Sequence, residues 1–300
     1  NTPVPPTATP ANTPTNTPIP PTMTPTNTAT AAPTPTNTPV PPTPTPPPSG
    51  DVIYVSSSTD GTAGGVAFAD EDILSYNAGV WSMVFDGSDV SVTVDLNAFH
   101  FMTDGSILMS FDTAASIGGL GTVDDSDIVR FTPTSLGTNT AGSFAWYFDG
   151  SDVGLTTTAE DIDALDVLSD GLLVISTEGS FSVTGASGGD EDLVAFTPTS
   201  IGSNNSAGSW ALRFDGSDVG LNTTNNEDVV AAWTDNASDA IYLSTLGTFS
   251  VTGVSGDGAD IFVCAPGTLG SATTCTFSMY WDGSANGFTG EVVDALSIQR

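Results

Sequence analysis

The side chains that could do chemistry in this chain are almost all carboxylates. The sequence holds 35 Asp and Glu residues against three arginines, one histidine and no lysine, and its net charge is -32. Any Ser-His-Asp or Cys-His arrangement would have to use His100. Carboxylates and the carbonyls of Gly-rich loops suit a hard cation such as Ca²⁺, which takes about six to eight oxygens in irregular geometry. The composition therefore favours cation binding, or a charge that only keeps an exposed protein soluble, over nucleophilic catalysis.

Two sets of residues are candidate ligands for Ca²⁺. The first lies in acidic clusters that recur along the chain: Asp70, Asp72, Asp125, Asp127, Asp190 and Asp192. The second occupies equivalent places on strands expected beside a central channel: Asn97, Asp163 and Asp294. Neither set has the spacing of an EF-hand loop. Because Asp-Gly and Ser-Asp are also turn formers, a purely structural role and a structural role combined with calcium both remain open.

A repeated hexapeptide organises the elements that must position these acids. Phe-Asp-Gly-Ser-Asp-Val occurs at residues 85–90, 148–153 and 214–219, and a degraded copy begins at Trp281. Self-similarity at a period of 63 to 67 residues indicates a repeat architecture rather than several unrelated domains.

Each repeat carries four short strand signals in a fixed order. In the clearest copy, residues 161–168 and 172–176 form a hairpin around Asp170-Gly171, residues 192–196 follow, and a turn-rich stretch at 197–208 leads to residues 209–214. Four antiparallel strands, each too small to bury its own faces, are typical of one β-propeller blade. Recurring aromatic residues on the fourth strand are expected to pack between blades.

The two ends of the repeat region complete each other. Residues 51–56 form a second strand with no first strand before it, and residues 291–298 form a first strand with no second strand after it. Pairing them closes four repeats into a ring and removes the exposed sheet edges. The sequence therefore predicts an all-β fold, a four-bladed propeller over residues 51–300 in which the C-terminal strand pairs with the N-terminal strand.

The blade pattern resembles known propeller repeats. Two apolar runs around Asp-Gly, followed by strands such as Ile241-Tyr242-Leu243-Ser244, are similar to NHL and two-component-regulator repeats. The resemblance covers residues 51–300 and implies the propeller fold and its strand-paired closure, although four blades are unusual for those families.

The two cysteines are placed to join neighbouring strands of the last repeat. Cys264 lies at the position held by Phe196 in the preceding repeat, and Cys275 lies at the position of Gly208. Because adjacent antiparallel strands come within disulfide reach, we expect a Cys264–Cys275 bridge and an oxidising compartment.

Residues 1–50 form a segment of a different composition. They hold 18 of the 21 prolines, sixteen threonines and no charged residue, which predicts an extended, hydrated stalk. Thr34, Thr36 and Thr38 are examples of candidate O-glycan acceptors, and a plain linker is the alternative.

The composition also bounds the partners. Strong negative charge disfavours nucleic acid and anionic lipid, and no apolar run is long enough to insert into a membrane. The sequence therefore predicts a non-enzymatic, extracellular or cell-surface propeller that binds a surface protein or glycan, or assembles with itself, in adhesion, display or structure. The alternative is a carbohydrate-binding or glycoside-cleaving propeller that uses acidic loop residues.

Overall fold

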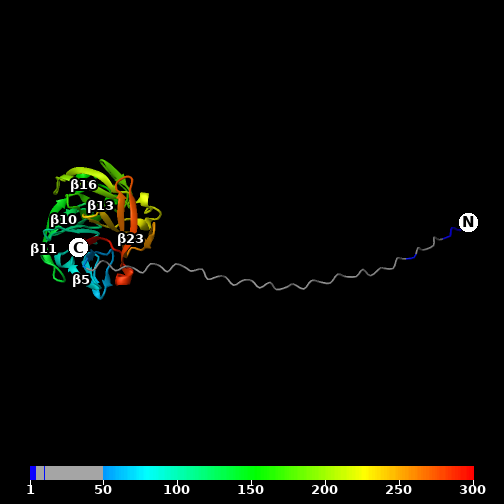
Figure 1. Ribbon diagram of the computed structural model, residues 1–300, viewed down its shortest axis with the longest axis horizontal. Helices are drawn as coiled ribbons and strands as arrows, with labels where there is room; N and C mark the ends of the chain where they lie inside the picture. Colours follow the sequence, from blue (N-terminus) through cyan, green and yellow to red (C-terminus); the bar gives the residue numbers. More distant parts are fainter. Residues whose placement is uncertain (5–9, 11–49) are drawn as a thin grey trace. The chain divides into compact units, whose positions relative to one another are not determined.

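The computed structural model describes residues 1–4, 10 and 50–300, and all of its strands lie between Val52 and Gln299. Thr34, Thr36 and Thr38, with most of the Pro/Thr-rich segment, fall outside the described residues. Among the residues that are described, no helix is long and apolar enough to cross a membrane. Sixteen strands form four antiparallel sheets, and these sheets are the blades of a β-propeller (Figure 1). The predicted all-β, four-bladed fold is confirmed.

The strands of each blade follow one order from the innermost strand outward. Blade 1 consists of β24 (Leu296–Gln299), β1 (Val52–Val55), β4 (Ile73–Asn77) and β5 (Val80–Phe85). Blade 2 consists of β6 (Ala98–Phe101), β7 (Ile107–Ser110), β10 (Ile128–Ser135) and β11 (Ala141–Phe148). Blade 3 consists of β12 (Ile162–Val167), β13 (Leu173–Thr177), β16 (Leu193–Ser200) and β17 (Ala207–Phe214). Blade 4 consists of β18 (Ala231–Asp235), β19 (Ala240–Ser244), β22 (Asp260–Thr268) and β23 (Thr274–Asp282).

The ring is closed by the same contacts at all four boundaries between blades. The innermost strands touch in a circle, β24 with β6, β6 with β12, β12 with β18 and β18 with β24. One backbone hydrogen bond recurs at the boundaries: Leu96 N donates to Asp70 O, Ile162 N to Asp125 O, Val229 N to Asp190 O and Val293 N to Gly258 O. The boundary between blade 4 and blade 1, the blade that contains both the first and the last strand, therefore has the same contacts as the other three.

The strand pairing within blade 1 confirms the predicted closure. In β1 and β24, Val52 lies opposite Gln299 and Val55 lies opposite Leu296. Figure 1 shows the first and last strands of the chain, in blue and red, in the same part of the ring. Regular pairing begins only at Leu296, later than the predicted residue 291, and Val293 N donates to Gly258 O of the neighbouring blade instead.

The connections contain more strand than the sequence predicted. The expected turn-rich stretch at 197–208 is wrong, since β16 and β17 pair as far as Ser200 opposite Ala207. Threonine favours strands, and Pro198 is tolerated because it lies at a register shift. The Gly/Ser-rich link between the second and third strands of each blade contains a small hairpin. These hairpins are β2 (Gly61–Ala63) with β3 (Val66–Phe68), β8 (Ala115–Ser116) with β9 (Thr122–Val123), β14 (Phe181–Val183) with β15 (Ala186–Gly188), and β20 (Phe249–Val251) with β21 (Val254–Gly256).

The apolar core consists of four clusters, one at each boundary between blades. At the boundary of blades 1 and 4, Trp81 and the fully buried Trp281 meet with their ring centroids 5.9 Å apart. Phe288 stacks on Trp81 from the segment that leads to β24. The predicted role of the recurring aromatic residues as packing between blades is confirmed here.

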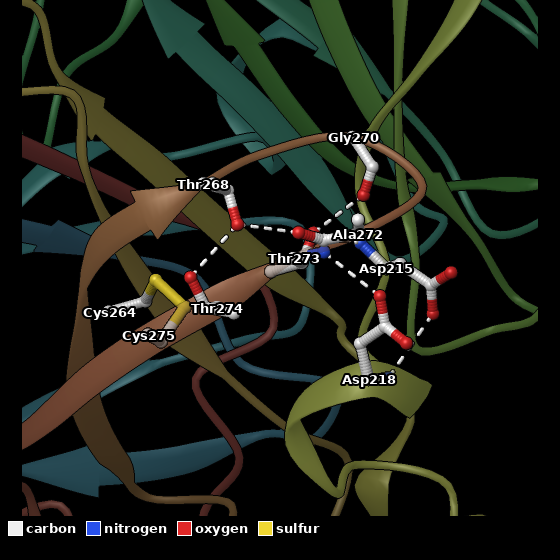
Figure 2. The surroundings of a disulfide bond; sticks show 9 residues. All are labelled: Asp215, Asp218, Cys264, Thr268, Gly270, Ala272, Thr273, Thr274 and Cys275. Atoms are coloured by element: carbon white, nitrogen blue, oxygen red, sulfur yellow. Dashed lines mark hydrogen bonds between the residues drawn. A yellow bond between two sulfur atoms is a disulfide. The ribbon is translucent and has the colours of Figure 1, made fainter.

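The cysteines form the predicted disulfide. Their Cα atoms are 5.2 Å apart, and the bridge joins β22 to β23 diagonally, since Pro266 lies opposite Cys275 and Cys264 lies opposite Phe277. In blade 3 the ring of Phe196 covers Gly208 so closely that a Cβ there would come within 2.5 Å of Cζ. Phe131 covers Gly142 in the same way in blade 2. Blade 4 has therefore exchanged an aromatic-glycine contact for a covalent bond (Figure 2).

This exchange can be reversed by mutation. A Cys264→Ala/Cys275→Ala variant should lose about 2–3 kcal/mol of unfolding free energy, the usual contribution of a bridge that closes a short loop. Cys264→Phe/Cys275→Gly should recover about 1–2 kcal/mol of that loss, because it restores the packing of blades 2 and 3. Urea unfolding of both variants checks the comparison. Equal stability of the two variants would contradict it.

Candidate functional site

The recurring acids divide into three groups with different surroundings. The first group starts the third strand of each blade and ties the hexapeptide to the preceding loop. In blade 3, Asp192 Oδ1 accepts a hydrogen bond from Gly216 N (2.8 Å), and Oδ2 accepts one from Gly189 N (2.9 Å). Equivalent pairs of bonds are made by Asp72, Asp127 and Asp260. Three of the predicted calcium ligands, Asp72, Asp127 and Asp192, thus use both carboxylate oxygens to hold backbone.

The second group lies in the hexapeptides and joins each blade to the next. Asp218 Oδ2 accepts a hydrogen bond from Thr273 N (2.9 Å), and Asp215 N donates to Thr273 Oγ1 (2.9 Å) (Figure 2). Asp89 contacts Thr140 and Asp152 contacts Ser206 in the same way. These contacts between the hexapeptide and the next blade's outer turn are not predicted by the sequence pattern. The cumulative twist of the blades brings the two together at the outer rim.

The sequence change in the fourth hexapeptide is explained by the blade that it contacts, blade 1. Blade 1 has only a short turn between β4 and β5, so no threonine or serine is present there to receive an aspartate. Ala285 replaces that aspartate, and the next residue, Asn286, accepts hydrogen bonds from the side chains of Tyr76 (2.5 Å) and Trp81 (2.8 Å). The sequence change therefore marks the boundary where the ring closes.

The third group surrounds a cavity of about 340 Å³ at the end of the central channel. Residues just before or at the start of the innermost strands line it from all four blades, and six of these carry polar side chains: Asp95, Asn97, Asp161, Asp163, Asp228 and Asp294. Asp112, Glu178 and Asp190 add three carboxylates from the links beyond the second strands. The structure brings together the predicted set Asn97, Asp163 and Asp294, and it adds Asp190 from the other set.

Five polar atoms in this cavity are buried and have no hydrogen-bond partner: Asp95 Oδ1, Asn97 Oδ1, Asp163 Oδ2, Asp228 Oδ1 and Asp294 Oδ2. The side chains of Asn97, Asp163, Asp228 and Asp294 belong to residues that are only 5–7 % exposed. An unsatisfied buried oxygen costs free energy, and a buried unpaired charge costs more. The residues with these unpartnered oxygens come from all four blades and line one cavity.

The burial of these acids changes their pKa values. Burial, together with the negative charges of Asp70 and Asp112, raises the pKa of Asp95 to about 8. Burial and the charge of Asp163 raise the pKa of Asp161 to about 9, and burial and Asp190 raise that of Asp228 to about 8. The pKa values of Asp163 and Asp294 are raised well above the ordinary value by burial. A cation in the cavity would offset this cost, since it favours the ionised form.

Sequence reasoning missed Asp95, Asp161 and Asp228. Asp161 opens the predicted strand at 161–168, and Asp95 and Asp228 lie at the equivalent places of their repeats, none of which is predicted to face the channel. A signal was present, because Asp95 and Asp161 each lie two residues before a predicted channel residue, Asn97 and Asp163 respectively, and Asp228 lies two residues before the equivalent Val230. No three acidic, histidine or cysteine side chains of the described residues converge closely enough to form a ready-made metal site. Any cation here must therefore be held by fewer protein ligands and by water.

The remaining members of the predicted loop set are Asp70 and Asp125. Their backbone carbonyls accept the hydrogen bonds from Leu96 N and Ile162 N, respectively. Their charges act on the cavity acids Asp95 and Asp161, respectively. His100 Nδ1 lies 3.0 Å from Asp166 Oδ1, on the neighbouring innermost strand β12. Asp166 Oδ2 also accepts a hydrogen bond from Thr234 N (2.8 Å) in blade 4, so the His100–Asp166 contact belongs to the packing of the channel.

Comparison with known proteins adds little to this site. No family model and no curated protein sequence matches the chain. Among solved structures, the chain is similar to selenomethionine-substituted virginiamycin B lyase from Staphylococcus aureus, at 9 % identity and a TM-score of 0.31. The match covers 76 % of this chain and 73 % of that one. A likeness at this level carries no argument about function, so the function must be inferred from the chain's own residues.

Proposed function

We propose that this chain is a non-enzymatic propeller module, displayed outside the cell on its Pro/Thr-rich segment, whose axial cavity binds a hard divalent cation. The observation that carries the proposal is the set of buried carboxylate and amide oxygens that line the cavity without partners. Oxygen ligands in an adaptable arrangement suit Ca²⁺ better than a transition metal. A cavity of about 340 Å³ leaves room for the waters that would complete its coordination.

The location outside the cell is supported by the Cys264–Cys275 bridge. Disulfides persist mainly in oxidising compartments. Extracellular Ca²⁺-binding modules have dissociation constants of about 10⁻⁴–10⁻³ M, which suits a site with few direct protein ligands. In this proposal the cation fixes the four blades around one axis, and the rigid ring is the part that an adhesive, display or structural role would present to a protein or glycan partner.

Calcium should stabilise the folded protein measurably. At a Ca²⁺ concentration about ten to a hundred times the dissociation constant, a ligand that binds only the folded state adds about 1.4–2.7 kcal/mol. For a unit of this size, the thermal midpoint should rise by about 3–8 °C at low salt. Melting the protein in CaCl₂ and in EGTA checks this result.

The control for that experiment is a matched pair of variants. Asp163→Asn/Asp294→Asn should abolish the calcium-dependent shift. Asp170 is exposed and lies outside the cavity, so Asp170→Asn should leave the shift unchanged. An equal midpoint for the unmodified protein in CaCl₂ and EGTA would remove calcium binding from the proposal.

A second candidate is carbohydrate binding or glycoside cleavage in the same cavity. It is favoured by Asp161, because its raised pKa of about 9 is the property that a general acid needs at neutral pH. It is opposed by the recurrence of the acids at several blade boundaries, since a catalytic pair occurs once in a molecule. Activity on a polysaccharide panel that is lost in Asp161→Asn, yet kept in Asp228→Asn, would reverse the order of the two candidates.

A further inference from the structure

The cavity side chains form pairs across the boundaries between blades. Two positions, two residues apart, lie just before or at the start of each innermost strand. The hydrogen bond between Asn97 and Asp161 joins the second position of blade 2 to the first position of blade 3. Applied to the equivalent positions of the other blades, this relation pairs Asp95 with Asp294, Asp228 with Asp163, and Val292 with Val230.

One of these pairings is a direct side-chain hydrogen bond. Asn97 Nδ2 donates a hydrogen bond to Asp161 Oδ1 (3.4 Å), from blade 2 to blade 3. For the Asp95–Asp294 pair, Asp294 acts on the pKa of Asp95, and Asp95 has the largest effect of any charged group on the pKa of Asp294. For the Asp163–Asp228 pair, Asp228 has the largest effect of any charged group on the pKa of Asp163.

The pairs differ in whether their own atoms can satisfy the buried oxygens or whether a bound proton or cation is needed. The Asn97–Asp161 pair has its own donor, so an amide proton satisfies one carboxylate oxygen. The valine pair needs no polar partner. In the two acid–acid pairs, both partners are acceptors when ionised, and each pair keeps an unpartnered oxygen on both residues: Oδ1 of Asp95 and Oδ2 of Asp294, Oδ2 of Asp163 and Oδ1 of Asp228. Only these two pairs keep an unpartnered carboxylate oxygen on both residues, so they are the pairs that an added positive charge would stabilise most.

We propose that the cavity holds two hard divalent cations, one between Asp95 and Asp294 and one between Asp163 and Asp228. The inference rests on the proposed cation-binding function and adds its stoichiometry and ligands. Each cation joins one carboxylate from each of two neighbouring blades, and water fills its remaining coordination. This arrangement agrees with the absence of any ready-made group of three ligands among the described residues. Asp294 belongs to the segment that leads into β24, so one cation also bridges blade 1, where the ring closes, to blade 2.

The test is a titration of the full chain with CaCl₂, followed by calorimetry. The unmodified protein should bind two ions per chain. Asp95→Asn and Asp228→Asn should each bind one, because an amide converts an acid–acid pair into the type that Asn97 and Asp161 already form. The double variant should bind none.

The reverse substitution gives the sharper readout. Asn97→Asp creates a third acid–acid pair and should raise the stoichiometry from two to three. Because this variant adds a site, its result cannot come from a loss of folding. Val230→Ala is the matched control at the apolar boundary and should leave the stoichiometry at two.

The outcomes separate the two proposals. One ion per unmodified chain, or no gain in Asn97→Asp, overturns the two-site inference and leaves cation binding in place. No binding heat and no calcium-dependent thermal shift overturn both, and would mean that each acid–acid pair shares a proton instead.

Discussion

A protein that ends at Gly290 should fail to fold cooperatively. The truncation removes β24, and with it the innermost strand of blade 1, the partner of β1. It also exposes the cluster in which Val293, Leu296 and Ile298 are buried. Three such side chains contribute about 5–9 kcal/mol by burial, which is comparable to the whole stability of a domain at about 5–15 kcal/mol.

The loss should be specific to the closing strand. The single sharp unfolding transition of the full chain, followed by near-ultraviolet circular dichroism, should become broad or vanish in the truncated protein. A peptide of residues 291–300 added in trans should restore it in part, since it can pair with the free edge of β1. Deletion of residues 1–49 is the control and should leave the midpoint unchanged. A truncated protein that melts as sharply and at the same temperature as the full chain would show that closure is dispensable.

The closing strand is visible in the sequence as a strand without a partner, and this is one reason why the fold could be predicted. The hexapeptide spacing, the Asp-Gly hairpins and the unpaired strand at each end are all local signals, and they lead to one closed arrangement. The disulfide could be predicted because Cys264 and Cys275 replace residues aligned with Phe196 and Gly208. In each case the prediction comes from comparing equivalent positions of the repeats. A single chain that contains several repeats is enough for such a comparison.

The surroundings of the acids were harder to predict because similar Asp residues take part in different interactions. Asp70 and Asp72 are two residues apart, yet the Asp72 carboxylate holds backbone NH groups and Asp70 presents its carbonyl to the next blade. Which group an acid meets depends on blade twist and on neighbouring turns. The contact of Asp218 with Thr273 joins residues 55 apart in the sequence, and only the three-dimensional arrangement brings them together. The facing pairs in the cavity are contacts of the same long-range kind.

Stability without calcium should fall as the pH rises from 6 to 8. Asp95 and Asp228 have pKa values of about 8 in the folded protein, and Asp161 about 9, against an ordinary value of 3.8. Between about pH 4 and these values, the folded protein holds protons that the unfolded chain has released. Because the folded state binds more protons, raising the pH shifts the equilibrium toward the unfolded chain. The stabilising contribution is complete below pH 4 and is lost as the pH passes through about 8–9.

The decrease of the unfolding free energy with pH should be large enough to measure. Each proton held only by the folded state corresponds to about 1.4 kcal/mol of unfolding free energy per pH unit. Urea unfolding in EGTA at pH 6, 7 and 8 should therefore show a decrease of at least about 1 kcal/mol per unit. Outside the cavity, Glu71 and Glu191 have pKa values of about 7, and Asp127 and Asp260 of about 6, so these acids also lose protons in this range. Measurement in about 0.3 M NaCl screens the repulsion between exposed charges. The contribution of the cavity is therefore the part of the slope that substitution of cavity acids removes. Asp170→Asn should keep the slope, whereas Asp163→Asn/Asp294→Asn should reduce it and be more stable at pH 8.

Calcium should reverse this dependence, because it competes with protons for the same oxygens. Because the pKa values of Asp95 and Asp228 are about 8, more of the cavity carboxylates are ionised at pH 8 than at pH 6. Ca²⁺ therefore displaces fewer protons at pH 8 and stabilises the protein more. At pH 6 binding must release protons, and the gain in unfolding free energy should be smaller by at least about 1 kcal/mol. Calorimetry in buffers of different ionisation enthalpy measures that release directly. Proton release that is absent at pH 6, or a calcium effect that weakens from pH 6 to 8, would show that the cation binds somewhere other than these buried carboxylates.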